Sequence, residues 1–570
     1  MHDTSPSPRW RLVAAALAAL LSAPLAAQPT VQTEGAIRAL MAEAQVPGVS
    51  LAVVEDGAVA WTGAYGLADV ESEAPVTPET VFEAASLSKP VTAYVALRLA
   101  ERGVIDLDAP LWDVLPYERL AHDARARTLT PRLVLTHRTG LPNWGATPLD
   151  LSLTPDERWG YSGEGFVYLQ RAMEAATGEP LDALARREVF EPFGMTHSSF
   201  VRRDGRAQAT GYDMLGEPRA LRQSDDANAA ASLVTTAGDY ARFLAGVLRG
   251  DGLAAETARE ALARQTDVPA APFSDDGDPA VGARVGWGLG WGVQDNEGRR
   301  AIWHWGDNGS FRAFVVGDPD RQSGVVFLTN SENGLSFAED LLALVSDAEP
   351  WAVRWLGYGR YDDPVRRARI QLGQTFLAEG AEAGLRLWDT LSADLDIERE
   401  LTAAARLLAD RGRPSEALAV AERVVEAAPE SAEGWAALGE VQTATGDHRA
   451  ALASLERALA LAPEFAGALE ARLAWLREGL AEPVALPAAD LRALAGRYGE
   501  RQLVYRDGAL HYARVGSTSE TTLTPLGDGL FRLASSSTFR IRVLTDEAGR
   551  PSAVEGRYAN GHRDVSERTD

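Results

Sequence analysis

The sequence has 570 residues, of which 46 % are hydrophobic and 24 % charged, a composition typical of a globular chain. A chain of this length is expected to form about two to four domains. The net charge is −25, with 81 acidic and 56 basic residues, which argues against a surface that binds nucleic acid or an anionic membrane. Cysteine is absent, so disulfides, thiol catalysis and a cysteine-linked lipid anchor are excluded.

The N-terminus has the pattern of a secretory signal peptide. Arg9 and Arg11 precede an apolar run over residues 12–21, and small residues follow near Ala26 and Ala27. We predict a signal peptide over 1–27, with an uncleaved anchor as the alternative. The protein is then exported across an inner membrane to a periplasm or the exterior, and no transmembrane segment remains after cleavage.

The first folded segment is predicted over 28–361. Two β-rich runs flank Asp56 and Gly57, which is a strong hairpin signal. Further strands are expected at 288–293, 301–306, 311–316 and 325–329, and the region between the two groups of strands is helical and loop-rich. Strands at both ends with helices between them predict one sheet covered by helices.

A candidate nucleophile lies at the start of a predicted helix in this segment. Ser86 precedes Lys89 by three residues, so one helical turn brings the amine within reach of the hydroxyl. Pro90 supports this placement, because proline is tolerated in the first turn of a helix. The helix dipole there favours the negative charge that develops on Ser86.

Other residues supply the remaining parts of an acyl-transfer site. Tyr161, with a pKa lowered by neighbouring cations, would accept or return the serine proton. His304 lies on a late strand, and Gly306 allows a close approach of the backbone to the substrate. The N–H groups of Ser86 and Asp307 would then form the oxyanion hole.

These motifs, in this order, resemble the serine β-lactamase and penicillin-binding-protein superfamily. The similarity is greatest to the class C β-lactamase-like branch, which includes esterases and D-amino-acid-specific peptidases. It includes an S-x-x-K motif at 86–89, a tyrosine motif at 161–163, and H-x-G at 304–306 in place of K-T-G. Connecting segments at 75–82, 135–142, 191–196 and 235–239 are also similar. The resemblance implies an α/β (α+β) sandwich, with Lys89 as base and no cofactor.

Two departures from the family pattern concern substrate binding. Gly163 stands where the family usually has asparagine, and Asn143 and Glu164 are the candidates to replace that amide. Trp305 stands where β-lactamases have a serine or threonine hydroxyl, which an indole cannot replace.

His304 lacks the permanent charge of a lysine at the start of the third motif. Together with Trp305, it favours a flatter, more apolar acyl substrate over a β-lactam. Trp144 and Trp305 are the predicted walls of that site, and plain packing is the alternative for both. His137 is predicted to brace its loop. The eight histidines show no metal-ligand spacing, so no metal site is expected.

Two further segments follow. Residues 365–480 are helical and contain a 34-residue period that resembles the tetratricopeptide repeat, good over 432–465 and fair over 398–431. At least three helical pairs are expected, either binding a protein partner or serving as a spacer. Residues 488–570 are β-rich with turns at 507–508, 528–529 and 548–549, and predict a small antiparallel sheet or barrel. This segment resembles the β-domains appended to some hydrolases of the same family.

The sequence therefore predicts an exported, esterase-like serine hydrolase that acts on a small-molecule or peptide acyl substrate. One alternative is a D-amino-acid peptidase or β-lactamase acting on peptidoglycan-like substrates. The other is a non-catalytic binding protein that uses its repeats. A rate comparison between esters, D-Ala-D-Ala peptides and cephalosporins separates the enzymatic alternatives.

Overall fold

The computed structural model describes residues 29–221, 225–273, 277–296, 298–391, 397–517 and 519–569. The chain divides into two compact units, Met1–Arg366 and Arg367–Asp570. The predicted signal peptide over 1–27 lies outside the described residues. Within the described ranges, no helix combines the length and the apolar character that a membrane crossing needs.

The first unit is built on a nine-stranded sheet, in the order β3-β2-β1-β13-β12-β11-β10-β9-β8. Strands from both ends of the segment meet at its centre, because β1 pairs antiparallel with β13. This confirms the prediction of one sheet formed from both termini. The strands are β1 (Gly48–Glu55), β2 (Ala58–Asp69), β3 (Ala74–Pro75), β8 (Thr266–Asp267), β9 (Val285–Trp287), β10 (Gly292–Asn296), β11 (Arg299–Asp307), β12 (Arg312–Asp318) and β13 (Ser323–Thr329).

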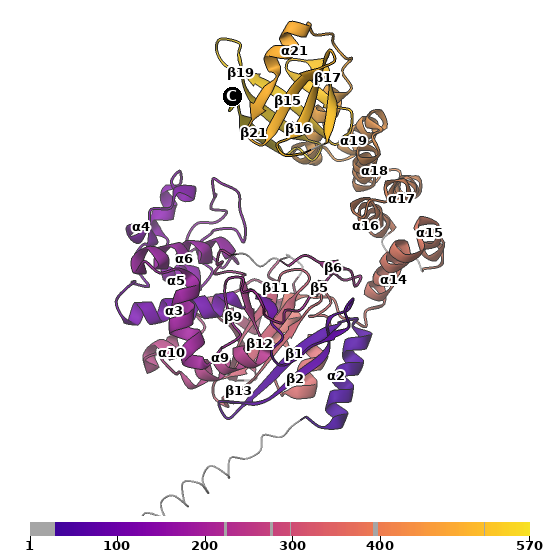
Figure 1. Ribbon diagram of the computed structural model, residues 1–570. Helices are drawn as coiled ribbons and strands as arrows, with labels where there is room; N and C mark the ends of the chain where they lie inside the picture. Colours follow the sequence, from indigo (N-terminus) through magenta and orange to yellow (C-terminus); the bar gives the residue numbers. More distant parts are fainter. Residues whose placement is uncertain are drawn as a thin grey trace, which may run out of the picture. The chain divides into compact units, whose positions relative to one another are not determined.

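Helices cover both faces of this sheet, as strand β1 shows. Val49, Leu51 and Val53 pack into one buried cluster, and Ala52 and Val54 pack into another on the opposite face. The first face is covered by α2 (Val31–Glu43), α12 (Ala338–Val345) and α13 (Trp351–Leu356). On the second face lie α3 (Ser88–Glu101) and α9 (Ala237–Arg249), which Figure 1 shows on the side of the sheet away from α2.

A helical lobe adjoins the second face and completes the predicted sandwich. Its elements are α4 (Leu111–Val114), α5 (Pro131–Leu135), α6 (Gly163–Thr177), α7 (Leu181–Ala185), α8 (Glu191–Phe193) and α10 (Ala255–Ala261). Helix α11 (Pro279–Ala283) instead packs against α13 and β9, on the first face. Short turns of helix lie at Glu118–Leu120, Ala124–Thr128 and Arg186–Phe190. Two small sheets pair β4 (Phe82–Ala85) with β7 (Leu233–Thr235), and β5 (Gly211–Tyr212) with β6 (Pro218–Arg219).

Of two local predictions, the hairpin at 56–57 is confirmed and the strand at 288–293 is not. The hairpin is confirmed, since Asp56 and Gly57 both have positive φ between β1 and β2. The single strand expected at 288–293 is wrong. Residues 288–291 turn between β9 and β10, because Gly290 adopts a φ of +82° and its N–H donates to Leu135 O.

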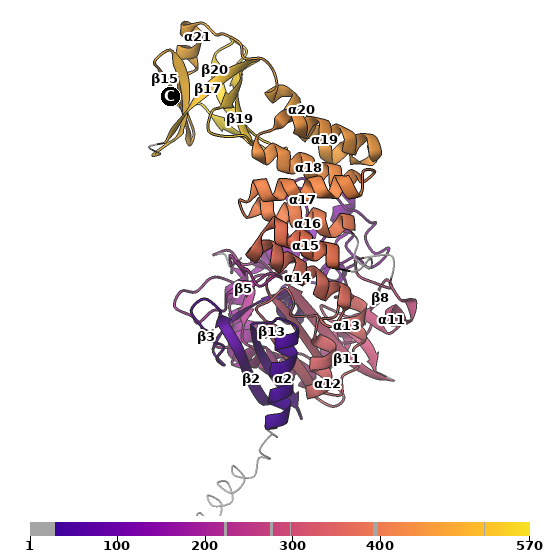
Figure 2. The ribbon, with the colours of Figure 1, turned by 90° about the vertical axis from the view of Figure 1, so that its right-hand side faces the viewer.

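The second unit begins with helical repeats, as predicted. The helices are α14 (Pro364–Glu379), α15 (Ala381–Thr390), α16 (Ile397–Asp410), α17 (Pro414–Ala427), α18 (Ala432–Thr445), α19 (His448–Leu461) and α20 (Ala466–Gly479). They form three antiparallel pairs followed by one closing helix, and Figure 2 shows α14 to α20 stacked in chain order. Each pair packs on the next, so the apolar face of one pair is buried by its neighbour.

The C-terminal part is an eight-stranded antiparallel sheet in strict sequence order. A short helix, α21 (Ala488–Leu494), precedes it. Its strands are β14 (Gly496–Tyr498), β15 (Arg501–Arg506), β16 (Ala509–Arg514), β17 (Glu520–Gly527), β18 (Leu530–Leu533), β19 (Phe539–Thr545), β20 (Pro551–Tyr558) and β21 (Arg563–Glu567). Tyr498 bridges Arg568, and Thr569 N donates to Arg497 O at 2.8 Å, so the first strand pairs with the end of the chain. The sheet therefore closes into a small barrel.

Candidate active site

Ser86 lies on the turn between β4 and α3. Ala85, the last residue of β4, has a φ of 48°, an uncommon conformation for a residue other than glycine. Ser88 fixes this turn, because its hydroxyl donates to Ala85 O at 2.6 Å and accepts from Leu233 N at 2.9 Å. The turn therefore presents Ser86, which is partly exposed, at the base of a cleft.

Lys89 lies beneath this serine and is completely buried. Its Nζ is 3.0 Å from Ser86 Oγ and 2.9 Å from Ala230 O, which accepts a hydrogen bond from it. Burial holds the pKa of Lys89 well below its usual range, because the charged form loses its hydration. The amine is therefore suited to act as a neutral base toward the hydroxyl.

Lys89 is also the only lysine in the chain, since all other basic residues are arginine. An arginine side chain cannot be deprotonated in a protein, whereas a buried lysine can. A single lysine in a chain rich in arginine is therefore a sequence signal for a lysine whose proton matters, independent of the motifs.

Tyr161 immediately precedes Ser162, the N-cap of α6. Its ring lies 4.7 Å from Lys89 Nζ, measured to the ring centroid. The expectation that neighbouring cations lower its pKa is wrong. Burial raises the pKa of Tyr161, and only the interaction with the Ser86 side chain acts in the opposite direction. Its hydroxyl is buried and has no hydrogen-bond partner of ordinary geometry among the described residues. Tyr161 is therefore a neutral donor rather than a base.

The two histidines near Lys89 are both buried and neutral. His304 Nδ1 lies 2.8 Å from Trp305 O, and burial together with Lys89 lowers the pKa of His304 to about 3. His137 Nδ1 accepts from Ser162 N at 3.1 Å, so it braces the residue that caps α6, and burial also lowers its pKa. Neither imidazole supplies a positive charge at neutral pH.

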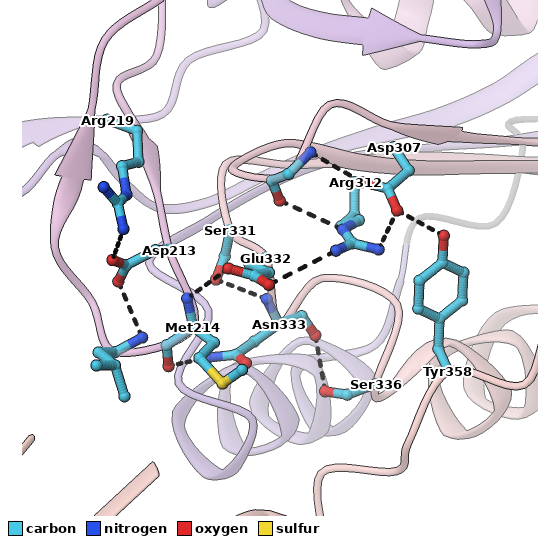
Figure 3. A network of polar contacts seen from close by, with 12 residues as sticks. Asp213, Met214, Arg219, Asp307, Arg312, Ser331, Glu332, Asn333, Ser336 and Tyr358 are labelled. Carbon is cyan, nitrogen blue, oxygen red and sulfur yellow. Dashed lines mark hydrogen bonds and ion pairs between the residues drawn. The ribbon is translucent and has the colours of Figure 1, made fainter. Parts of the chain in front are cut away.

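The end of β11 approaches β4 closely, at the position where the sequence predicts an oxyanion hole. A Cβ at Gly306 would overlap Ala84 O, so only glycine allows this approach. Asp307 follows, and both Asp307 and Ser86 line the same cleft. The Asp307 carboxylate is not free to act on the nucleophile, because it is held by other side chains. It is bound by Arg312 and by Tyr358 Oη, the latter at 2.7 Å (Figure 3).

Gly163 leaves room for another part of the chain. A Cβ at 163 would lie 2.7 Å from Asn143 O and 2.9 Å from the Trp144 ring. The amide of Asn143 also binds this position, since its Oδ1 accepts from Gly163 N at 3.0 Å. A loop that carries Asn143 and Trp144 therefore occupies the space that a side chain at 163 would need, and both residues line the cleft.

Two of the residues predicted to bind substrate are placed elsewhere. Glu164 forms an ion pair with Arg119 at 2.6 Å and accepts from Gly145 N at 3.1 Å, so it holds the loop rather than lining the cleft. Trp305 is buried, with its ring centroid 4.7 Å from that of Tyr161. It packs against the Tyr161 ring and does not line the cleft.

The cleft has a volume of about 430 Å³ and is more polar than predicted. Its lining residues are Glu83, Ser86, Asn143, Trp144, Arg171, Asp226, Ala227, Asn228, Ala231, Ser232, Val234, Asp307 and Asn308. The expectation of an apolar site between two tryptophans is therefore wrong, since Trp144 is the single aromatic residue of this lining. Carboxylates outnumber cations, and Arg171 is itself paired with Glu174 at 3.0 Å.

Several residues that build the site carry no recognisable motif. Ala230 acts only through its backbone carbonyl, so no side-chain pattern marks it. Asn308 holds Glu83 at 2.8 Å on the cleft wall, and Tyr358 reaches Asp307 from outside the strands that form the site. Contacts of this kind depend on chain topology, which a single sequence does not display.

The chain is similar to known proteins over both of its units. The β-lactamase family matches residues 33–349, and a tetratricopeptide-repeat family matches residues 398–441. Penicillin-binding protein 4 of Amycolatopsis lactamdurans is 29 % identical over 333 residues, which cover 53 % of this chain and 86 % of that protein. Esterase EstB of Burkholderia gladioli is 32 % identical over 215 residues, which cover 32 % of this chain and 54 % of the esterase.

Among solved structures, the D-alanine carboxypeptidase AmpC of Burkholderia cenocepacia is 21 % identical. The aligned part covers 55 % of this chain and 97 % of that one, with a TM-score of 0.47. The family match spans the sheet, the helical lobe and the group Ser86, Lys89 and Tyr161, of which Ser86 lines the cleft. This chain belongs to the β-lactamase family.

Proposed function

We propose that the protein is an exported serine hydrolase that cleaves an ester or amide through an acyl-enzyme on Ser86. The observation that carries this proposal is the 3.0 Å separation of Ser86 Oγ from the Nζ of a fully buried lysine. A neutral amine at that distance is a general base for the hydroxyl, and such a base contributes about 10²- to 10⁴-fold in rate.

The mechanism follows from the positions of the side chains. Lys89 takes the proton of Ser86 as Oγ attacks the carbonyl carbon, and the N–H groups of Ser86 and Asp307 stabilise the oxyanion. Tyr161 then gives its proton to the leaving group and recovers one from the Lys89 ammonium. Water hydrolyses the acyl-enzyme in the same way, with Lys89 again as the base. His304 stays neutral and shapes the surroundings of Lys89.

The lining of the cleft supports a proposal for the substrate class. The third motif offers a neutral, buried His304 where a permanent charge would hold a carboxylate, and the cleft carries an excess of acidic side chains. Both features disfavour an anionic group beside Ser86. We therefore expect a polar acyl substrate that is neutral or cationic, with Asn143 and Trp144 contacting it.

A D-amino-acid peptidase is the second candidate, and the polarity of the cleft favours it. Amide groups along a peptide need hydrogen-bond partners, which Asn143, Asn228, Ser232 and Asn308 are placed to offer. The relatives include a penicillin-binding protein as well as an esterase. Comparing rates on simple esters, D-Ala-D-Ala peptides and cephalosporins decides between these substrate classes.

Location and partners are further parts of the proposal. We propose export because residues 1–27 have the pattern of a signal peptide. The protein would then be located in the periplasm or outside the cell. The repeats are proposed to bind a protein partner, since stacked helical pairs of this kind form extended binding surfaces.

The first test is hydrolysis of p-nitrophenyl butyrate by the full chain beside Ser86→Ala. We expect turnover in the wild type that disappears in the variant. Equal rates in both proteins would overturn the proposed nucleophile.

A further inference from the structure

Asp307 has a backbone N–H group in the proposed oxyanion hole and a carboxylate that is held by other residues. Its backbone N–H belongs to the proposed oxyanion hole, while its carboxylate is enclosed by donors from three places. Oδ1 accepts from Gly309 N at 2.8 Å, and Oδ2 receives Arg312 and the Tyr358 hydroxyl. The orientation of the side chain, and with it that of the last peptide of β11, is thus determined from outside the cleft.

Tyr358 is the most distant of these donors along the chain. It follows α13 and Gly357, whose φ of +70° ends that helix, and it lies beyond the 33–349 range of the family match. Its hydroxyl donates to Asp307 Oδ2 at 2.7 Å, and its ring centroid lies 4.7 Å from the Arg312 guanidinium. Burial raises the pKa of Tyr358, so the hydroxyl keeps its proton and acts as a donor.

The segment that carries Tyr358 is held on the catalytic unit by other contacts. Tyr361 N donates to Ser336 O at 3.2 Å, and Arg360 forms an ion pair with Asp340 at 2.8 Å. These contacts fix the position of Tyr358 relative to β11 and β12. Figure 3 shows Tyr358 and Arg312 both reaching the Asp307 carboxylate.

We propose that Tyr358, together with Arg312, is a positioning residue that aims the Asp307 N–H at the oxyanion. This inference rests on the proposed function. Without the Tyr358 hydroxyl, Asp307 keeps its backbone donor but loses one of the contacts that orient it. A misdirected donor weakens binding of the tetrahedral state more than binding of the ground state.

The test uses the full chain with Tyr358→Phe, which removes only the hydroxyl. We expect kcat for p-nitrophenyl butyrate to fall about tenfold with KM nearly unchanged, because a mispositioned donor costs less than an absent one. The inhibition constant of phenylboronic acid, which forms a tetrahedral adduct on serine, should rise by the same factor. A purely structural role would not move these two quantities together.

Tyr361→Phe is the matched control, because it removes the same hydroxyl three residues away, where the side chain bonds to Asp340. It should leave kcat and boronate affinity unchanged. In an Asp307→Asn background, Tyr358→Phe should have little further effect, because both changes act through one carboxylate.

Unchanged kcat and boronate affinity in Tyr358→Phe would overturn the inference while leaving the proposed function intact. An equal loss in Tyr361→Phe would also overturn it. If the ester is not turned over, the boronate titration alone decides. If the wild type and Ser86→Ala bind boronate equally, the proposed function fails and the inference fails with it.

Discussion

At the scale of single residues, the proposed chemistry depends on the protonation state of Lys89. The folded chain holds its pKa well below the unfolded value of 10.5, so the unfolded chain binds a proton that the folded chain does not. Burying Lys89 therefore lowers stability below the unfolded pKa, and the penalty decreases as the pH rises. This cost maintains a neutral amine next to Ser86.

A first prediction follows for pH dependence. We expect kcat/KM to fall as the pH drops through the lowered pKa of Lys89, because a protonated amine cannot accept the serine proton. Lys89→Arg should lose about 10²- to 10⁴-fold in kcat, since the guanidinium stays charged. The single lysine allows a direct check, because ¹⁵N-lysine labelling gives one side-chain resonance. An ammonium signal from Lys89 at neutral pH would contradict the assignment.

The residue types of the site were predictable, but their electrostatic states were not. Ser86, Lys89, Tyr161 and His304 lie near one another in the structure, and the catalytic roles assigned to them stay predictions. The direction of the pKa shift of Tyr161 was wrong, because it depends on burial and on a neighbouring amine that is itself neutral. Glu164 was misassigned for a similar reason, since its partner Arg119 comes from a different loop.

At the scale of elements, the site depends on how closely β11 approaches β4. Gly306 permits this contact, and Asp307 follows it directly. The strand pattern predicted one sheet formed from both ends of the segment, but not the turn at 288–291, because the pattern does not show that Gly290 adopts a positive φ. The distance between β4 and β11, which belong to different sheets, cannot be predicted from the hydrophobic pattern of the sequence.

Gly306→Ala tests this spacing. The added methyl group would overlap Ala84 O, so we expect β11 to move away from β4, the ester hydrolysis rate to fall at least about tenfold, and stability to drop by about 1–3 kcal/mol. Gly35→Ala in α2 is the control, because nothing lies within 4 Å of its Cβ position. It should retain activity and unfold at an equal or higher temperature. Full activity in Gly306→Ala would show that the strand spacing is not required.

At the scale of the whole molecule, the second unit joins the repeats to the barrel. Arg540 of the barrel donates to Trp475 O and lies 3.5 Å from the centroid of that ring, and Trp475 Nε1 donates to Arg557 O at 3.3 Å. His448 Nε2 lies 2.7 Å from Ser537 O. The 34-residue period predicted the repeats, and the regular turns predicted the strands. The packing of the repeats against the barrel was not predictable, because the residues in contact are far apart in the sequence and follow no local pattern.

Trp475→Ala tests whether the repeats and the barrel are one cooperative unit. We expect a loss of about 3–5 kcal/mol in stability, since a buried tryptophan is truncated. Hydrogen exchange should show that α18 to α20 and the barrel strands lose protection together, while ester hydrolysis by the first unit persists. Loss of protection confined to α20 would mean that the two parts fold independently.

The proposed mechanism requires a covalent intermediate at Ser86. The most direct measurement is intact mass spectrometry of the full chain, acid-quenched during turnover of p-nitrophenyl butyrate, followed by peptide mapping. We predict one added butyryl group, located on Ser86 and absent from Ser86→Ala. Turnover by the wild type without any adduct on Ser86, or an adduct on a different residue, would contradict this prediction.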